Sequence, residues 1–144
     1  MIIDHTLVFS DQQAITVSAA STNIWDTLAV GLPYGWVSPR TPDRGEGYAE
    51  IPMLVQVTEV FATLTSLTIA LEMDDNPAFS SPTVVATTGP VLTALLVPGY
   101  RARLLSRMPK GVTERYIRLN YTVVGASATT GKIFAAVTGG NQSN

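Results

Sequence analysis

Residues 67–74 read LTIALEMD, and this stretch decides the fold class. Its apolar side chains occupy every second position, namely Leu67, Ile69, Leu71 and Met73. Successive side chains of an extended strand point to opposite faces, so this spacing predicts a strand with one buried face and one polar face. Residues 117–123 (IRLNYTV) repeat the alternation, and Met53, Val55 and Val57 form a third row.

Shorter segments rich in Val, Ile and Thr predict further strands, because these residues favour pleated surfaces. They are residues 6–9, 14–17, 22–26, 83–87, 92–97, 102–107 and 132–138. Gly and Pro pairs such as 89–90 and 98–99 separate them. We expect 116–124 and 132–138 to form a hairpin around the polar loop 125–131, with 139–144 as a polar tail. Many short strands at this spacing indicate an all-β sandwich, jelly roll or barrel.

The composition limits the domain count and the classes of function. A chain of 144 residues fits one domain, 1–144. It has no cysteine, which excludes disulfides and thiolate metal sites. Nine basic against eleven acidic residues leave a net charge of −2, so we expect no direct nucleic-acid partner. The most apolar run, 91–97, is far shorter than the ~18 residues of a membrane helix, so we expect no membrane contact.

The proportion of charged residues is low and needs an explanation. It is 14%, against about 25% in a typical soluble domain. A small soluble domain usually carries more surface charge. The sequence therefore predicts that partners cover much of the surface, that neutral Ser and Thr hydroxyls coat it, or both.

The segment 27–50 interrupts the strand pattern. It contains Pro33, Pro39 and Pro42 with several glycines, and a loop this long inside one domain is usually functional or disordered. Aromatic residues argue against disorder, and Tyr, Trp and Arg are enriched at the centres of interfaces. The interface candidates in and beside this segment are Trp25, Tyr34, Trp36, Arg40, Arg44 and Tyr48. We favour an arm that packs on a neighbour, and the alternative is a lid over an open end of the same domain.

Catalytic constellations are weak in this sequence. His5 is the only histidine, and Asp4, Ser10 and Asp11 are its only sequence neighbours for a triad, so a surface or interface histidine is the preferred interpretation. Glu72 and Asp74 share the polar strand face, where we expect solvated charges that discourage aggregation. Asp74, Asp75 and Asn76 lack the spacing of a calcium loop. We therefore expect no enzyme, no cofactor and no metal.

Arginine outnumbers lysine seven to two, which favours fixed, bidentate pairing. Arg101, Arg103 and Arg107 fall at odd positions of one predicted strand and would share a face. Together with Arg115 and Arg118 they would make a basic strip for nucleic acid. The acidic balance of the chain and the absence of interleaved aromatics count against this. We favour salt bridges at the rim of an interface with an acidic partner.

The first 26 residues carry a resemblance to a known family. After the opening MIID, residues 9–16 read FSDQQAIT and residues 19–26 read AASTNIWD. This pattern resembles the start of the Bbp16-like capsid cement (decoration) proteins of tailed phages. RGEG at 44–47 and YIRLNYTV at 116–123 also fit.

The resemblance implies a jelly-roll subunit on the outer surface of the phage head. Such a subunit lies across capsomer junctions, binds the major capsid protein and stabilises the mature shell. It is a homo-oligomer, with a dimer favoured and a trimer possible, and it carries no catalytic residues. Met1–Ser10 is then expected to be the first strand of its own sheet, and the alternative is pairing with a neighbour's strand edge.

Two other functions remain open at the level of sequence. A head-closure or tail component of a phage has a similar composition but binds at one vertex. A carbohydrate-binding jelly roll would use Trp25, Tyr34 and Trp36 as sugar platforms.

Overall fold

The long alternating runs of the sequence become two very long strands. β4 (Met53–Asp74) has 22 residues and β6 (Tyr116–Thr138) has 23. They pair antiparallel over almost their whole length, from Met53 opposite Val137 to Asp74 opposite Tyr116. This pair forms the centre of the sheet, and the other strands pair with one or the other of the two.

The computed structural model describes residues 3–28, 35, 37–38 and 51–139. The remaining elements in this part of the chain are β1 (Ile3–Ala14), β2 (Ala19–Ala20), β3 (Trp25–Asp26), β5 (Thr83–Leu92) and the 3-10 helices η1 (Thr93–Leu95) and η2 (Arg103–Leu105). The sheet order is β1-β6-β4-β5, and β2 and β3 also pair with β6. No helix within these residues is long and apolar enough to span a membrane. The all-β prediction is confirmed.

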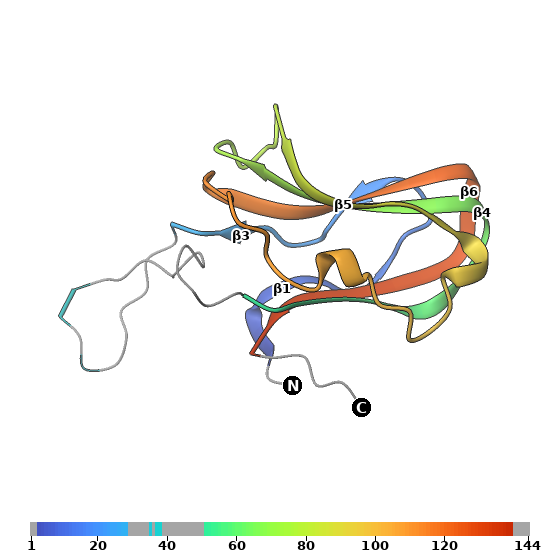
Figure 1. Ribbon diagram of the computed structural model, residues 1–144, viewed down its shortest axis with the longest axis horizontal. Coiled ribbons are helices and arrows are strands. Elements are labelled where there is room, and N and C mark those ends of the chain that lie inside the picture. Colours follow the sequence, from blue (N-terminus) through green and yellow to red (C-terminus); the bar gives the residue numbers. More distant parts are fainter. Residues whose placement is uncertain (1–2, 29–34, 36, 39–50, 140–144) are drawn as a thin grey trace.

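The sheet bends back over itself and forms two layers (Figure 1). One layer holds β5, the second half of β4 and the first half of β6, with β2 and β3 at its other edge. The other layer holds β1 with the remaining halves of β4 and β6. The arrangement is compatible with the expected jelly-roll sandwich.

The bend lies where the register between β4 and β6 is irregular. Ala62 pairs with Thr130 and Leu64 pairs with Gly125, so β6 contains extra residues at this corner. Three residues here have positive φ: Thr63 (75°), Gly125 (93°) and Gly131 (138°). Such bulges bend strands and increase their twist. The corner is therefore built into the backbone of both strands.

The predicted hairpin of 116–124 and 132–138 is wrong. The two segments are parts of one strand, they lie in different layers, and each pairs with β4. Residues 125–131 carry the chain around the corner. The connection after β1 joins them there, since the Ile15 N–H donates to Gly131 O (3.0 Å) and the Ala128 N–H to Thr16 O (2.8 Å).

The predicted strands 92–97 and 102–107 are also wrong, because both contain 3-10 turns. Residues 97–108 still follow the edge of β4: the Val57 N–H donates to Tyr100 O (2.9 Å) and the Met53 N–H to Ser106 O (2.8 Å). Between these contacts, η2 turns inward and buries Leu105 completely. Burial of that side chain replaces a regular ladder with an irregular edge.

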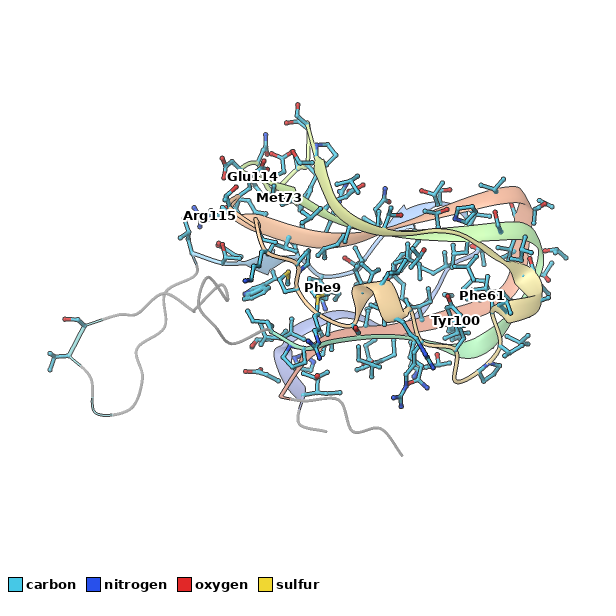
Figure 2. All side chains as sticks on the ribbon, in the orientation of Figure 1. Phe9, Phe61, Met73, Tyr100, Glu114 and Arg115 are labelled. Carbon is cyan, nitrogen blue, oxygen red and sulfur yellow. The ribbon has the colours of Figure 1, made fainter. Side chains whose placement is uncertain are left out.

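The hydrophobic core fills the space between the layers (Figure 2). Side chains predicted from the alternation are buried there, including Leu67, Ile69 and Leu71. Phe9 comes from β1 and Phe61 from the corner. Each fully buried aliphatic or aromatic side chain contributes about 1.5–3 kcal/mol. The apolar rows thus hold the two layers together.

Ile3–Ala14 pairs with β6, from Ile3 opposite Thr138 to Ala14 opposite Lys132. It therefore serves as the first strand of its own sheet.

The corner generates a stability prediction. A Cβ on Gly125 would overlap Thr65 Oγ1 and lie 2.9 Å from the Thr65 backbone nitrogen. We expect Gly125→Ala to cost about 2–4 kcal/mol of unfolding free energy, from strained φ and from overpacking. Gly111→Ala is the matched control, because its φ of 95° is similar but its Cβ would meet open space.

Gly111→Ala should lose only the unfolding free energy that the strained φ costs, about 1–2 kcal/mol. Chemical denaturation of both variants measures the difference. Equal losses would show that the corner is not tightly packed.

Candidate interaction surface

Two polar residues of FSDQQAIT, Ser10 and Gln13, belong to a hydrogen-bond network that reaches the buried Tyr121. Ser10 Oγ donates to Gln13 Oε1 (2.7 Å), and this leaves the Tyr121 hydroxyl to donate to Ser10 Oγ (2.7 Å). Gln13 Nε2 donates to Ala20 O, and the Thr22 N–H donates to Gln13 Oε1, both at 2.9 Å. Burial raises the pKa of Tyr121 above its ordinary value, so the phenol stays protonated. The network links β1 to the half of β6 in the opposite layer.

The polar residues of AASTNIWD are also used in structural hydrogen bonds. Ser21 Oγ donates to Asn23 O (2.9 Å) and accepts from the Leu119 N–H (3.1 Å). Asn23 binds the outer edge of β1, since its N–H donates to Phe9 O and its Nδ2 to Val8 O, both at 2.9 Å. These side chains fix backbone groups that would otherwise lack partners.

Trp25 lies in the hydrophobic core with only 8% of its surface exposed. Among the interface candidates it is the one that lies within the described residues. Its burial leaves little of the indole for a partner, so its role here is to pack β3 against the core. Tyr34, Trp36, Arg40, Arg44 and Tyr48 lie outside the described residues, and the choice between arm and lid stays a prediction.

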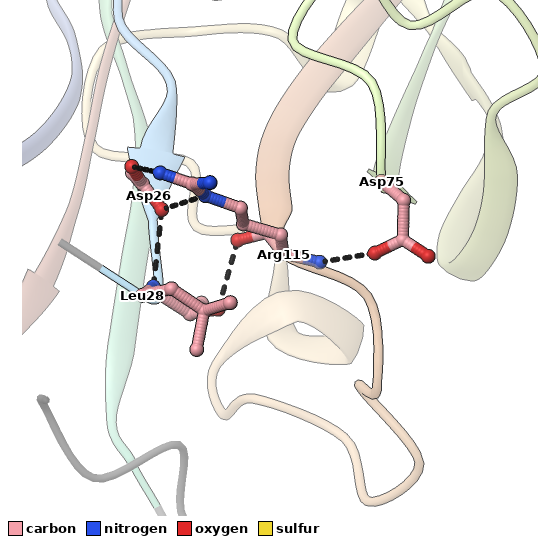
Figure 3. A network of polar contacts seen from close by, with 5 residues as sticks. Asp26, Leu28, Asp75 and Arg115 are labelled. Atoms are coloured by element: carbon pink, nitrogen blue, oxygen red, sulfur yellow. Dashed lines mark hydrogen bonds and ion pairs between the residues drawn. The ribbon is translucent and has the colours of Figure 1, made fainter.

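Asp26 and Thr27, which precede residues 29–50, are both bonded to Arg115 (Figure 3). The Arg115 guanidinium donates to both carboxylate oxygens of Asp26, at 2.8 Å each, and this pairing raises the pKa of Arg115. The Arg115 N–H donates to Asp75 Oδ1 (3.0 Å). Its carbonyl accepts from the N–H and hydroxyl of Thr27, at 2.9 and 2.8 Å. Because the ion pair is partly exposed, solvent screens it and its contribution to stability is small.

Glu72 and Asp74 are buried, at 5% and 6% exposure, which corrects the expectation of solvated charges. Glu72 accepts from the Arg118 guanidinium (2.8 Å) and from Asn120 Nδ2 (2.8 Å). The Arg118 guanidinium in turn lies over the Phe79 ring, 4.0 Å from its centroid. The turn after β4 thus folds back over this end of the sheet.

Asp74 serves that same turn. It accepts from the N–H groups of Asn76 (2.8 Å) and Ser81 (2.9 Å), and these bonds hold its pKa below the usual value. The two carboxylates are therefore occupied in fixing the backbone and an arginine.

The residues considered for a triad are not brought together. His5 is exposed on β1, whereas Ser10 points into the core and is bonded to Gln13 and Tyr121. Asp4 accepts from the N–H (2.9 Å) and hydroxyl (2.7 Å) of Thr6, which lower its pKa. Within residues 3–28 and 51–139, no three His, Asp or Glu side chains gather as metal ligands.

The five arginines outside 29–50 do not form one strip. Arg115 and Arg118 lie at the start of β6 and are paired with carboxylates. Arg107 forms an isolated bridge with Pro52 at the irregular edge. Arg101 and Arg103 are exposed on that same edge, and their guanidinium groups make no ion pair or hydrogen bond within the described part of the chain.

Arg101 and Arg103 lie beside two hollows, which we call the edge cleft. The larger, about 450 Å³, lies between β5 and the irregular edge and is lined by Thr88, Gly99, Tyr100, Arg101, Arg103 and Leu104. The smaller, about 280 Å³, is lined by Met53, Leu54, Val55, Arg101, Ala102, Arg103 and Ser106. Leu104, in the lining of the larger hollow, is 71% exposed. Sequence reasoning identified the arginines but missed the hollows, because they depend on the turn of η2.

The fold and these contacts define an all-β protein built on two long antiparallel strands that bend into two layers. The chain belongs to the Bbp16 family, whose model matches residues 9–137. This match covers both the N-terminal network and the edge cleft. No curated protein matches the sequence.

The N-terminal network generates a double-mutant prediction. Ser10→Ala should cost about 1–3 kcal/mol, because it leaves the buried Tyr121 hydroxyl without an acceptor. Tyr121→Phe should cost about 0.5–1.5 kcal/mol, because Ser10 keeps its bond to Gln13. The double variant should lose less than the sum of the two, by about 1 kcal/mol. Denaturant titration of the four proteins measures this coupling, and strictly additive losses would contradict the link between the layers.

Proposed function

We propose that this chain is a structural virion protein that acts as a capsid cement (decoration) protein. It binds the outer surface of a phage head across capsomer junctions and stabilises the mature shell. Its partners are the major capsid protein and further copies of itself, as a dimer or a trimer. The basis is the resemblance of residues 1–26 to phage cement proteins, together with the physical features below.

The observation that carries the proposal is that the polar side chains of the N-terminal motif form hydrogen bonds and an ion pair within the domain. Ser10, Gln13, Ser21, Asn23 and Asp26 all bind other parts of the scaffold. The residues that carry the resemblance therefore maintain a rigid shape. A rigid subunit that binds only the assembled lattice stabilises that lattice by mass action.

The surface has the properties that such binding needs. Many exposed side chains are neutral hydroxyls, for example Thr65, Thr87, Thr122 and Thr129. Large apolar side chains are exposed around η1 and η2, namely Leu92, Leu95, Val97 and Leu104. Gathered apolar side chains are typical of interaction sites. Several modest contacts made by one oligomer add through effective concentration.

The carbohydrate-binding alternative has less support. Sugar platforms need exposed aromatic rings, but every aromatic side chain within residues 3–28 and 51–139 is buried or half-buried. Trp25, one of the three platform candidates, belongs to the core. A head-closure or tail component would share the scaffold. Such a component would be present in the few copies that one vertex holds, whereas the copy number of a cement protein rises in proportion to that of the shell protein.

The proposal predicts the behaviour of heads that lack this chain. They should release DNA at lower temperature, or at smaller osmotic shock, than complete heads, because lattice contacts are lost. Dye-detected DNA release during heating measures this. Adding back the purified protein is the control and should restore the release temperature.

Heads that are equally robust without the protein would contradict stabilisation. Quantitative mass spectrometry of the particles gives the copy number. A few copies per particle would favour the head-closure or tail function.

A further inference from the structure

We propose that the edge cleft binds an extended acidic segment of the shell protein, with Arg101 and Arg103 as the carboxylate-binding residues. The segment carries Asp or Glu beside at least one apolar side chain. The identity of the partner rests on the proposed function, whereas the chemistry of the segment rests on the cleft itself.

The two arginines differ from their counterparts on β6. Arg115 and Arg118 each hold a carboxylate at 2.8 Å. Arg101 and Arg103 are exposed, and their guanidinium groups have no acceptor within the described residues. Guanidinium groups match carboxylates through two parallel hydrogen bonds. Two unpaired groups at neighbouring positions therefore make a receptor for a carboxylate-bearing partner.

The lining supports charge complementarity. The whole chain has a net charge of −2, yet none of the described residues that line the two hollows is an Asp or Glu. The cleft is therefore locally basic on an acidic protein. An acidic segment gains attraction there, whereas it is repelled by the chain as a whole.

The shape indicates an extended segment that also has apolar side chains. Arg101 and Arg103 line both hollows, so one ligand can contact them from either side. The smaller hollow has an apolar lining that includes Leu54 and Ala102. Leu104 and the half-buried Tyr100 flank the larger one. A chain across the cleft would place a carboxylate at the arginines and an apolar side chain against Leu104, which is 71% exposed.

Nucleic acid fits this surface less well. Single strands bind proteins through exposed aromatic rings that stack on bases, and through a basic groove that follows the phosphates. Here Tyr100 is the one aromatic side chain lining either hollow within the described residues, and it is half-buried. The peptide titration below therefore includes an oligothymidine, which tests whether the cleft binds a phosphate chain instead.

The first test is an NMR titration of the isotope-labelled full chain. The probe is a short peptide with two Asp and two Leu residues, and its counterpart carries Lys in place of Asp. We expect amide shifts at Thr88 and residues 99–106 with the Asp peptide alone. They should disappear in the R101Q/R103Q variant. No shifts, equal shifts with both peptides, or equal shifts with an oligothymidine would overturn the proposal.

K110E is the matched control variant. It changes the net charge by the same two units as R101Q/R103Q, and Lys110 is exposed outside the cleft lining. Both variants should melt like the wild type, because they alter exposed side chains. K110E should keep the peptide shifts. If K110E also lost the shifts, the change in net charge alone would explain the result of R101Q/R103Q, and the proposal would be overturned.

The second test measures binding to heads that lack this protein. R101Q/R103Q should bind about tenfold or more weakly than wild type, and K110E should bind like wild type. Equal binding of R101Q/R103Q would overturn the cleft proposal and leave the cement function intact. No binding of the wild type would refute the cement function, and the peptide titration would then decide the cleft alone.

Discussion

The antiparallel pairing of β4 with β6 is the constraint on which the rest of the structure depends. Straight strands of this length would extend about 70 Å, roughly twice the width of a domain of this size. The pair must therefore bend, and it does so at Thr63, Gly125 and Gly131, where φ is positive. The bend brings the two halves of the sheet face to face, and their alternating apolar rows become one core.

The N-terminal motif completes this arrangement with polar contacts. The bend joins the layers at one end, and hydrogen bonds between side chains link them further along. Ser10 and Tyr121 bond across the layers, and Gln13 extends the bond to the backbone around β2. Asn23 then binds the outer edge of β1. Polar side chains of residues 9–26 therefore help to specify the layered fold.

Sequence reasoning predicted what is local and missed what is not. The period-two rows of β4 and β6 identified the strands and their buried faces correctly. The predicted hairpin around 125–131 is wrong because small polar residues with glycine are typical both of hairpin turns and of corners within one strand. The alternation predicts that Glu72 and Asp74 face solvent. It does not show that the turn after β4 brings Phe79 back over this face, because that contact depends on the tertiary fold. The arginines of the edge cleft were recognised, but their hollows depend on η2, which forms because Leu105 is drawn into the core.

The corner has a mechanical consequence. Both long strands cross from one layer to the other, so the layers are joined by covalent backbone as well as by side-chain packing. A load that separates the faces at this end must stretch two polypeptide segments, which do not yield as apolar contacts do. The corner therefore resists separation of the two layers more strongly than side-chain packing alone would.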